Sequence, residues 1–448
     1  MEDFNKIDEG INMSVDMIQS RVGNEGKVIV LVSGGVDSMV TAALLLAALP
    51  AENIYAIHVD HGFMRKNESD FVFEQLKKLG FKNLLRVDAK DKFLHTKVEI
   101  DDGVFAGPLI DVTDPETKRQ IIGSLFIEVV REAADTLELD YDKTFIAQGT
   151  LKPDLIESAN TDLLGGDGDK NRIKTHHNDV DIVRKARAKG LIIETNWNWY
   201  KEDVRQAARR LGIAEEIASR QPFPGPGLAV RQICSNKNIL AEPNGENRKS
   251  FDNLMKSLNI NGLVAPILSV GVQGEARSYK NLAVLFGDGL DADFGKISEA
   301  AAVIPEKLDF INRCVYVLNK KNIESDGITC GELTMAEENT NLLREIDHIV
   351  TSEITKFLKG SGNLNKITQY FGVLTPIQTI QSAGNQYAAV IRAFLTVDYM
   401  TGMAAVPGKD IPVEVIRAIC GRIEKELDKI GLILYDLTGK PPATMEWE

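Results

Sequence analysis

The sequence predicts an α/β protein in which a parallel-sheet domain is followed by two repeated α+β units. Three observations support this. Apolar strands alternate with helical stretches over about the first 220 residues. The stretch SGGVDS joins one strand to a helix, and the second half of the chain contains an internal repeat. Because 448 residues exceed what one core accommodates, we expect a first domain over 1–225 and repeats over 226–365 and 366–448.

The elements of the first domain follow from its apolar runs. Strands are predicted at residues 28–32, 54–59, 84–87, 144–147 and 191–194, and helices at 38–48, 68–79, 118–137 and 201–211. This alternation is typical of a parallel sheet covered on both faces. The segment RQPFPGPGLAVR, residues 220–231, ends the pattern, because prolines that alternate with glycines exclude a helix or a central strand.

The repeat appears as two pairs of similar stretches. APILSVGVQGEARSYKNLAVLF begins at Ala265 and TPIQTIQSAGNQYAAVIRAF begins at Thr375, and each predicts a hairpin of two apolar strands around a glycine-containing turn. Further on, IPEKLDFINRCVYVL from Ile304 is matched with IPVEVIRAICGRI from Ile411, each read as a helix that starts near its proline. Two matches at nearly one spacing indicate a duplication.

Composition narrows the class of protein. With 44% hydrophobic and 26% charged residues the chain is typical of soluble globular proteins. No run of about 18 apolar residues occurs, so we expect no membrane span. The acidic N-terminal stretch is unlike a signal peptide, and the four dispersed cysteines fit reduced thiols, so we expect a cytoplasmic protein. A net charge of −13 disfavours a nucleic-acid binder.

The SGGVDS stretch predicts a phosphate site. Its glycines lack Cβ atoms, so the backbone can approach an anion and direct N–H groups toward it. The helix that follows contributes the positive end of its dipole. The hydroxyls of Ser33 and Ser38 and the carboxylate of Asp37 add polar groups. The alternative is an ordinary glycine-rich turn from a strand into a helix.

The chemistry of this loop follows from a residue that it lacks. The pattern G-x-x-x-x-G-K-[ST] has a lysine that reaches the β- and γ-phosphates and assists transfer of the γ-phosphoryl group. SGGVDS has no such lysine. It is better suited to hold β- and γ-phosphate together as a leaving pyrophosphate. The sequence therefore favours attack at the α-phosphorus, which is adenylation.

Longer stretches carry a resemblance to a known family. SGGVDS resembles the signature of the ATP pyrophosphatases, which implies a PP-loop, adenine-nucleotide α-hydrolase-like fold. Stretches similar to GMP synthetase are HVDHGFMRKNE, DPETKRQIIGSLFIEV, AQGTLKPDLIES, KTHHND, QPFPGPGLAVR and YDLTGKPPATMEWE. The resemblance covers essentially the whole chain. It is to the branch with an enlarged, duplicated C-terminal region.

The resemblance implies an activity and its cofactors. ATP, with Mg²⁺, would activate the C2 oxygen of xanthosine monophosphate (XMP) as an adenylyl ester, and ammonia would displace AMP to give GMP. The implied ATP-binding residues are Ser33, Gly34, Gly35, Val36, Asp37, Ser38 and Met39. Asp154 and Glu157 are candidate metal ligands, since carboxylates together with phosphates bind magnesium. Ordinary acidic residues at a helix start are the alternative reading.

The resemblance also implies catalytic and XMP-binding residues. The implied catalytic residues are Asp37, Lys174, His176 and His177, the last three in a polar segment at about residues 160–190 that is expected to close as a lid. The implied XMP-binding residues are Arg184, Glu275, Arg277, Gln369, Lys440, Met445 and Glu446. The family usually has aspartate at the position of Glu275 and a β-branched residue at that of Met445. Another purine nucleotide therefore stays an alternative substrate.

Partners are expected from what the resemblance leaves out. Nothing in the chain resembles the family's glutamine amidotransferase domain. Ammonia is therefore expected either free or from a separate glutaminase subunit, unless the chain was cut at a domain junction. Two fused repeats predict a monomer or a weak homodimer. A tRNA-modifying ATP pyrophosphatase is the alternative function, which the negative charge and the lack of paired cysteines disfavour.

Overall fold

The computed structural model describes residues 2–101, 103–140, 142–150, 186–236, 240–273, 276–321, 323, 327–361, 367–382, 386–396 and 401–448. The chain divides into two compact units. The first consists of residues 1–105 and 120–223, and the second of residues 106–119 and 224–448. Within the described segments, no helix has the length and apolar character that crossing a membrane requires.

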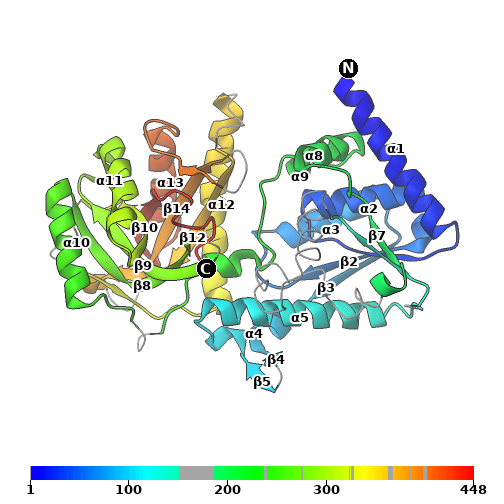
Figure 1. The fold of residues 1–448 in the computed structure, drawn as a ribbon, viewed down its shortest axis with the longest axis horizontal. Coiled ribbons are helices and arrows are strands. Elements are labelled where there is room, and N and C mark those ends of the chain that lie inside the picture. The colour runs from blue at the N-terminus through cyan, green and yellow to red at the C-terminus, as the bar shows by residue number, and fades with distance from the viewer. Residues whose placement is uncertain are drawn as a thin grey trace. The chain divides into compact units, whose positions relative to one another are not determined.

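The first unit is built on a five-stranded parallel sheet in the order β3-β2-β1-β6-β7. Figure 1 labels β2, β3 and β7 of this sheet. Its strands are β1 (Val28–Leu31), β2 (Ile54–Asp60), β3 (Asn83–Asp88), β6 (Phe145–Gln148) and β7 (Ile192–Glu194). The predicted α/β class and parallel sheet are thereby confirmed. From β1 the chain adds strands first on one side and then on the other. The strand order therefore reverses at β1, where open α/β sheets bind their ligands.

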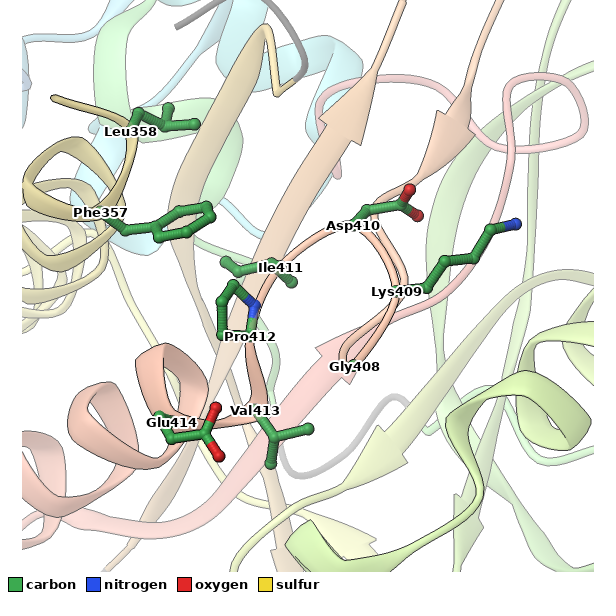
Figure 2. Close-up of a pocket in the computed structure, with 9 residues that line it drawn as sticks. All are labelled: Phe357, Leu358, Gly408, Lys409, Asp410, Ile411, Pro412, Val413 and Glu414. Atoms are coloured by element: carbon green, nitrogen blue, oxygen red, sulfur yellow. The ribbon is translucent and has the colours of Figure 1, made fainter. Parts of the chain in front are cut away.

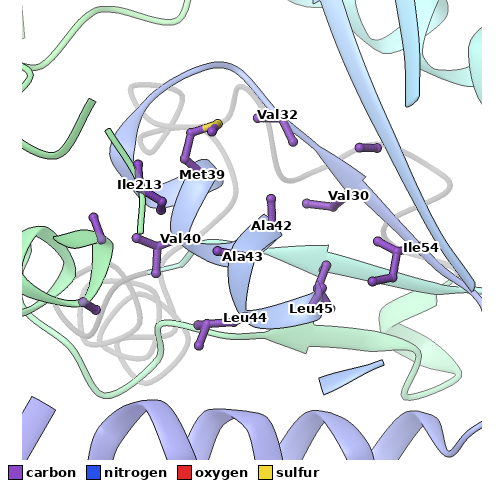
Figure 3. Packing of buried hydrophobic residues seen from close by; sticks show 14 of the residues in the cluster. Val30, Val32, Met39, Val40, Ala42, Ala43, Leu44, Leu45, Ile54 and Ile213 are labelled. Carbon is purple, nitrogen blue, oxygen red and sulfur yellow. The ribbon is translucent and has the colours of Figure 1, made fainter. Parts of the chain in front are cut away.

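Helix α2 (Val36–Ala48) forms the centre of the first core. Its sequence is almost entirely apolar, and it is buried between the sheet and two other helices, α1 (Glu2–Val22) and α8 (Lys201–Arg210). Figure 3 shows Ala42 and Leu45 of α2 toward Val30 and Ile54 of the strands, and Val40 on the other side of the helix near Ile213. This packing fixes the start of α2 at the carboxyl end of β1.

The remaining elements of the first unit complete its surface. They are α3 (Glu68–Leu79), α4 (Lys90–His95), α9 (Glu215–Ala218) and the strands β4 (Val98–Asp101) and β5 (Val104–Ala106). Helix α5 (Pro115–Asp135) begins in the second unit and continues in the first. The four predicted helices are confirmed with bounds that differ by a few residues, whereas α1, α4 and α9 had not been predicted.

The second unit contains a larger mixed sheet. Six strands follow the order β12-β14-β16-β10-β9-β8, and β15 (Met403–Ala404) pairs with β14. The strands are β8 (Asn261–Gln273), β9 (Ala276–Phe286), β10 (Ile311–Val317), β12 (Gln369–Thr375), β14 (Tyr387–Leu395) and β16 (Ile430–Asp436). Its other elements are α10 (Gly245–Leu258), α11 (Phe294–Lys307), α12 (Glu337–Ser361), α13 (Val413–Glu426), β11 (Ile328–Cys330) and β13 (Ile377–Thr379).

The repeat is visible as two strand-strand-helix-strand units. One is β8-β9-α11-β10 and the other is β12-β14-α13-β16. The second sequence match was wrong, however. Pro305 lies near the end of α11, while Pro412 immediately precedes α13, so the two prolines mark opposite ends of equivalent helices. Proline is favoured at a helix start. The two stretches were matched on that signal alone, and the resulting alignment of the two copies was wrong.

Strand directions bring the ends of several strands to one edge of this sheet. β9 and β10 are parallel, β14 and β16 are parallel, and the two pairs are antiparallel where β10 meets β16. β12 is antiparallel to β14. The starts of β9 and β12 therefore lie at the same edge as the end of β16. Residues 437–448, which we call the tail, follow β16 at this edge.

The bounds of the two units can be compared with the domain boundaries expected from the sequence. The first unit ends at Phe223 and the second resumes at Pro224, within the proline-glycine segment. The boundary between residues 365 and 366 stays a prediction. Strands from both sides of it belong to one continuous sheet.

Candidate active site

The SGGVDS stretch forms the turn from β1 into α2, at the point where the strand order reverses. Gly34 has a φ of +86°, and a Cβ atom there would lie 2.4 Å from Cγ2 of Val72, so the position requires glycine. Gly35 precedes α2, and no side chain among the described residues caps this helix. The N–H groups of its first turn are therefore available to an anion.

Asp37 lies in the first turn of α2 beside a lysine from another helix. Nζ of Lys201 is 2.6 Å from Oδ2 of Asp37. Oδ1 of Asp37 is buried and has no hydrogen-bond partner in the described part of the chain. Since a buried carboxylate oxygen is rarely left without a partner, this atom marks a place for a cation, a ligand donor or a water.

Lys201 is a residue that the sequence analysis missed. It begins α8, whose first turn also contains Glu202 and Asp203. A lysine at the start of a helix opposes the helix dipole, and that was the available signal of a role other than helix formation. Its contact with Asp37 could not be predicted, because the residues are 164 positions apart.

The AQGT stretch lies against the start of α2. A Cβ atom at Gly149 would lie 3.1 Å from the backbone oxygen of Asp37 and 2.9 Å from Oγ1 of Thr41, so the backbones approach closely here. Oε1 of Gln148 and Oγ1 of Thr150 are buried, and neither has a hydrogen-bond partner among the residues described. Together with Oδ1 of Asp37, they give this edge three unsatisfied polar atoms, which is typical of a ligand site.

Arg220 fixes the conformation of the SGGVDS loop. Its Nη1 donates to the carbonyl oxygen of Gly34 at 2.9 Å, and its Nη2 lies 2.9 Å from Oε1 of Glu68. Oε2 of Glu68, which is almost fully buried, accepts the N–H of Arg65 at 2.8 Å. The arginine at the start of RQPFPGPGLAVR thus fixes the conformation of a loop far from it in sequence.

In the second unit, the tail is part of the fold. The N–H of Val272 on β8 donates to the carbonyl oxygen of Pro442 at 2.9 Å, and the N–H of Val270 donates to that of Trp447 at 3.1 Å. Trp447 is fully buried in the core of this unit, and Met445 packs against the same core. These contacts order the end of the chain at the edge of the sheet.

A buried charge cluster fixes the course of the tail. Oδ2 of Asp436 lies 2.6 Å from Nη1 of Arg313 and 2.7 Å from Nη1 of Arg392, and all three side chains are inaccessible to solvent. Nη2 of Arg313 donates to the carbonyl oxygen of Glu446 at 3.0 Å, and Nη2 of Arg392 donates to that of Thr444 at 3.0 Å. Burial acts to raise the pKa of Asp436, but the two arginine charges outweigh it and lower the pKa.

Glu446 and Lys440 are both positioned by other groups. Nε and Nη2 of Arg231 lie 2.8 Å and 2.9 Å from the two carboxylate oxygens of Glu446, and the guanidinium covers the ring of Phe371 at 3.8 Å. The backbone of Lys440 pairs with Gly402 in both directions, at 2.9 Å and 3.1 Å. The tail residues expected at XMP are therefore held at both ends of the proline-rich turn.

The other XMP candidates lie at the same edge. Arg277 is at the start of β9 and Gln369 at the start of β12. Nη1 of Arg277 is 2.9 Å and 3.0 Å from the carboxylate oxygens of Glu116, in the first turn of α5. Residues from distant parts of the second unit thus lie along the sheet edge at which its tail begins.

Comparisons with known proteins agree with these motifs. The family model described as the GMP synthase C-terminal domain matches residues 356–447, a range that includes most of the tail. A probable GMP synthase [glutamine-hydrolyzing] from Leptospira interrogans is 34% identical over 99% of this chain and 67% of its own length. The chain belongs to the GMP synthase family. The predicted resemblance is thereby confirmed.

Other relatives show how much of the family's usual length is present. GMP synthase from Dictyostelium discoideum is 33% identical over 98% of this chain, and the probable enzyme from Caenorhabditis elegans is 34% identical over 97%. The chain spans 65% of the length of each. Among solved structures, NMN synthetase from Francisella tularensis is similar over 50% of this chain and 78% of its own, at 14% identity and a TM-score of 0.34.

Several expected GMP synthase residues lie outside the described residues. They are Asp154, Glu157, Lys174, His176, His177, Arg184 and Glu275. Their roles stay predictions. Within the described residues, no group of three or more His, Cys, Asp or Glu side chains is arranged to hold a metal ion.

Two cavities are lined by described residues. One of about 450 Å³ lies between the end of α12 and the segment before α13, and Figure 2 shows Phe357 and Leu358 opposite Ile411 and Pro412. The other, of about 480 Å³ in the first unit, is lined by Met17, Arg21, Arg187, Gly190, Ile192, Glu194 and Trp197. Neither is lined by a residue expected to bind ATP or XMP.

Proposed function

We propose that this chain catalyses the ATP-dependent amination of XMP to GMP through an adenylyl-XMP intermediate, with AMP and pyrophosphate as the other products. The observation that carries the proposal is the lysine-free phosphate loop at the switch point of a parallel sheet, in a chain of the GMP synthase family. Such a loop suits a pyrophosphate that departs whole better than transfer of a single phosphoryl group.

ATP binding is assigned to residues 33–39 of the first unit. The positive φ of Gly34 and the uncapped start of α2 support binding of the β- and γ-phosphates there. Lys201, 2.6 Å from Asp37, adds positive charge for the pyrophosphate. The unsatisfied Oδ1 of Asp37 fits a Mg²⁺ ligand, with Asp154 and Glu157 as the expected further ligands. Bound there, the metal would neutralise charge on the phosphates.

The proposed reaction has two steps. The C2 oxygen of XMP attacks the α-phosphorus, the bond to the β-phosphate oxygen breaks, and pyrophosphate leaves. Ammonia then attacks C2, and AMP leaves with the former C2 oxygen. One proton is released in each step. The first step is needed because a urea-like carbonyl oxygen is a poor leaving group, and Lys174, His176 and His177 are proposed to neutralise charge on the departing pyrophosphate.

XMP binding is assigned to the sheet edge of the second unit where the tail begins. Arg277 and Lys440 are proposed to bind the nucleotide phosphate, since charged donors suit its oxygens. Glu446 is proposed to accept hydrogen bonds from the purine, and its fixed pairing with Arg231 supports this because a two-point ion pair holds the carboxylate in one orientation. Gln369 and Met445 would complete this side, with Arg184 and Glu275 as the remaining expected contacts.

We propose that the chain accepts ammonia, either free or from a separate glutaminase subunit. The cytoplasmic location and the monomeric or weakly dimeric state stay predictions.

The proposal is tested by incubating the purified chain with XMP, ATP, Mg²⁺ and ammonium and by separating the nucleotides chromatographically. We expect GMP and AMP in equal amounts. Inosine monophosphate in place of XMP is the control for another purine nucleotide, and glutamine in place of ammonium is the control for the nitrogen donor. No GMP from XMP, or ADP as the main product, would contradict the proposal.

A further inference from the structure

Glu116 connects two side chains of β9. Asp114 caps α5 by accepting the N–H of Thr117 at 2.7 Å, and Pro115 follows at the first helical position, where proline is favoured. Glu116 then lies in the first turn, where the helix dipole favours a carboxylate. Arg277 and Tyr279 alternate along β9 and so point to the same face, toward this carboxylate.

Glu116 contacts the guanidinium group of Arg277 through one nitrogen. Both carboxylate oxygens of Glu116 lie on a single nitrogen of Arg277, Nη1, at 2.9 Å and 3.0 Å. The hydroxyl of Tyr279 donates to Oε1 of the same carboxylate at 2.6 Å. In the described part of the chain, Nε and Nη2 of Arg277 have no hydrogen-bond partner. The face of the guanidinium that suits two-point binding of a phosphate is therefore left open.

A second positive charge, that of Arg119, lies near Arg277 and Glu116. Arg119 lies one turn after Glu116 on α5 and is largely buried. Burial and the nearby charge of Arg277 both lower the pKa of Arg119, while the charge of Glu116 raises it. Two arginine side chains that lie close together repel each other, and a carboxylate between them offsets this repulsion. Glu116 thus offsets a repulsion that would otherwise turn Arg277 away.

We propose that Glu116 is a positioning residue for nucleotide binding: it holds Arg277 through Nη1 so that Nε and Nη2 face the phosphate of the substrate. The inference rests on the proposed function, in which Arg277 binds the XMP phosphate. Tyr279 fixes the carboxylate in turn. The opposite role, a carboxylate that occupies Arg277 and competes with the phosphate, predicts the opposite sign in the same experiment.

The test compares steady-state constants of the full chain carrying Glu116→Ala, Glu116→Gln or Tyr279→Phe. We expect Glu116→Ala to raise the KM for XMP about 10-fold or more, since a charge-assisted contact is misplaced, while the KM for ATP and kcat change less than about twofold. Glu116→Gln keeps a hydrogen-bond acceptor and is expected to show a smaller rise. Glu132→Gln, on the same helix but paired with Lys92, is the matched control.

Each other outcome contradicts the positioning role. A lower XMP KM in Glu116→Ala would show that the carboxylate competes with phosphate. An unchanged KM, or an equal rise of both KM values with a lower melting temperature, would show an inert or a purely structural role. The unaltered chain is assayed first. If it makes no GMP, the proposed function fails, and calorimetric titration of XMP into the same proteins then decides the role of Glu116 by the same criteria.

Discussion

Tyr316 on β10 lies directly opposite Tyr435 on β16. The two tyrosines are equivalent positions of the repeat, because Tyr316 is opposite Leu285 of β9 just as Tyr435 is opposite Ile391 of β14. A pseudo-twofold axis therefore passes between them, and the two copies pair within one chain as two subunits of a symmetric dimer would. The residues that follow the two tyrosines differ: the first copy has Val317 on β10, whereas the second has Asp436 on β16.

Asp436→Asn is expected to destabilise the second unit by about 3–5 kcal/mol, because the charges of Arg313 and Arg392 would then be buried without a carboxylate. Urea unfolding followed by tryptophan fluorescence measures this change, since the ring of Trp447 lies 4.5 Å from the guanidinium of Arg313. Asp428→Asn, at an exposed aspartate of the same unit, is the control. Equal stability of the two variants would contradict the role given to this cluster.

The same carboxylate predicts a pH dependence. Its pKa lies below the ordinary value of 3.8, because the charges of Arg392 and Arg313 outweigh the effect of burial. A group whose pKa is lowered on folding stabilises the protein above its unfolded pKa and loses that effect as the pH falls through the folded pKa. The stability difference between the unaltered chain and Asp436→Asn should therefore be constant above about pH 5 and shrink below about pH 4. A difference that persists undiminished in unfolding curves at about pH 3 would refute this.

Lys440→Ala is expected to raise the KM for XMP strongly and the KM for ATP little. Loss of a charge-assisted phosphate contact costs roughly 1.5–3 kcal/mol, on the order of 10- to 100-fold. Initial rates with ammonium at saturating ATP give the value. Lys409→Ala, at an exposed lysine of the same unit, is the matched control. An XMP KM within about twofold of the original would remove Lys440 from the phosphate site.

Asp37→Ala is expected to abolish adenylation while leaving XMP binding nearly intact. The reason is that Asp37 belongs to the proposed phosphate loop of the first unit, whereas the residues assigned to XMP that the structure describes lie in the second. Pyrophosphate release measures the first property and calorimetric titration of XMP the second. Loss of both together would indicate that Asp37 maintains the fold instead.

The periodicity of the sequence predicted most of the first unit. Its parallel strands are buried on both faces, so each is a short continuous apolar run that is easily recognised. Helix α1 was missed although Ile7, Ile11, Ile18 and Val22 recur at helical spacing, because its acidic sequence was used only as evidence against a signal peptide. In the second unit the duplication could be recognised, but the pairing of β10 with β16 depends on contacts between residues more than a hundred positions apart, which no local pattern encodes.

For the candidate site residues, too, the sequence revealed local motifs but not the contacts between distant side chains. Motifs marked the segments that carry the candidate site residues of each unit, SGGVDS in the first and DPET and GKPPATMEWE in the second. They did not reveal that Lys201 pairs with Asp37, that Arg231 pairs with Glu446 or that Glu116 holds Arg277. Each of these pairs joins side chains that are 161 to 215 positions apart. Such pairs are set by the packing of whole elements and follow only from the fold.

The central claim is that ATP activates XMP by adenylation at its C2 oxygen, and an isotope label tests it most directly. XMP carrying ¹⁸O at C2 is incubated with the chain, ATP, Mg²⁺ and ammonium, and the products are examined by phosphorus NMR for the isotope shift. The account predicts that the label appears in the phosphate of AMP, because AMP leaves with the former C2 oxygen, and that pyrophosphate carries none. Label in orthophosphate, with ADP as the other product, would contradict it.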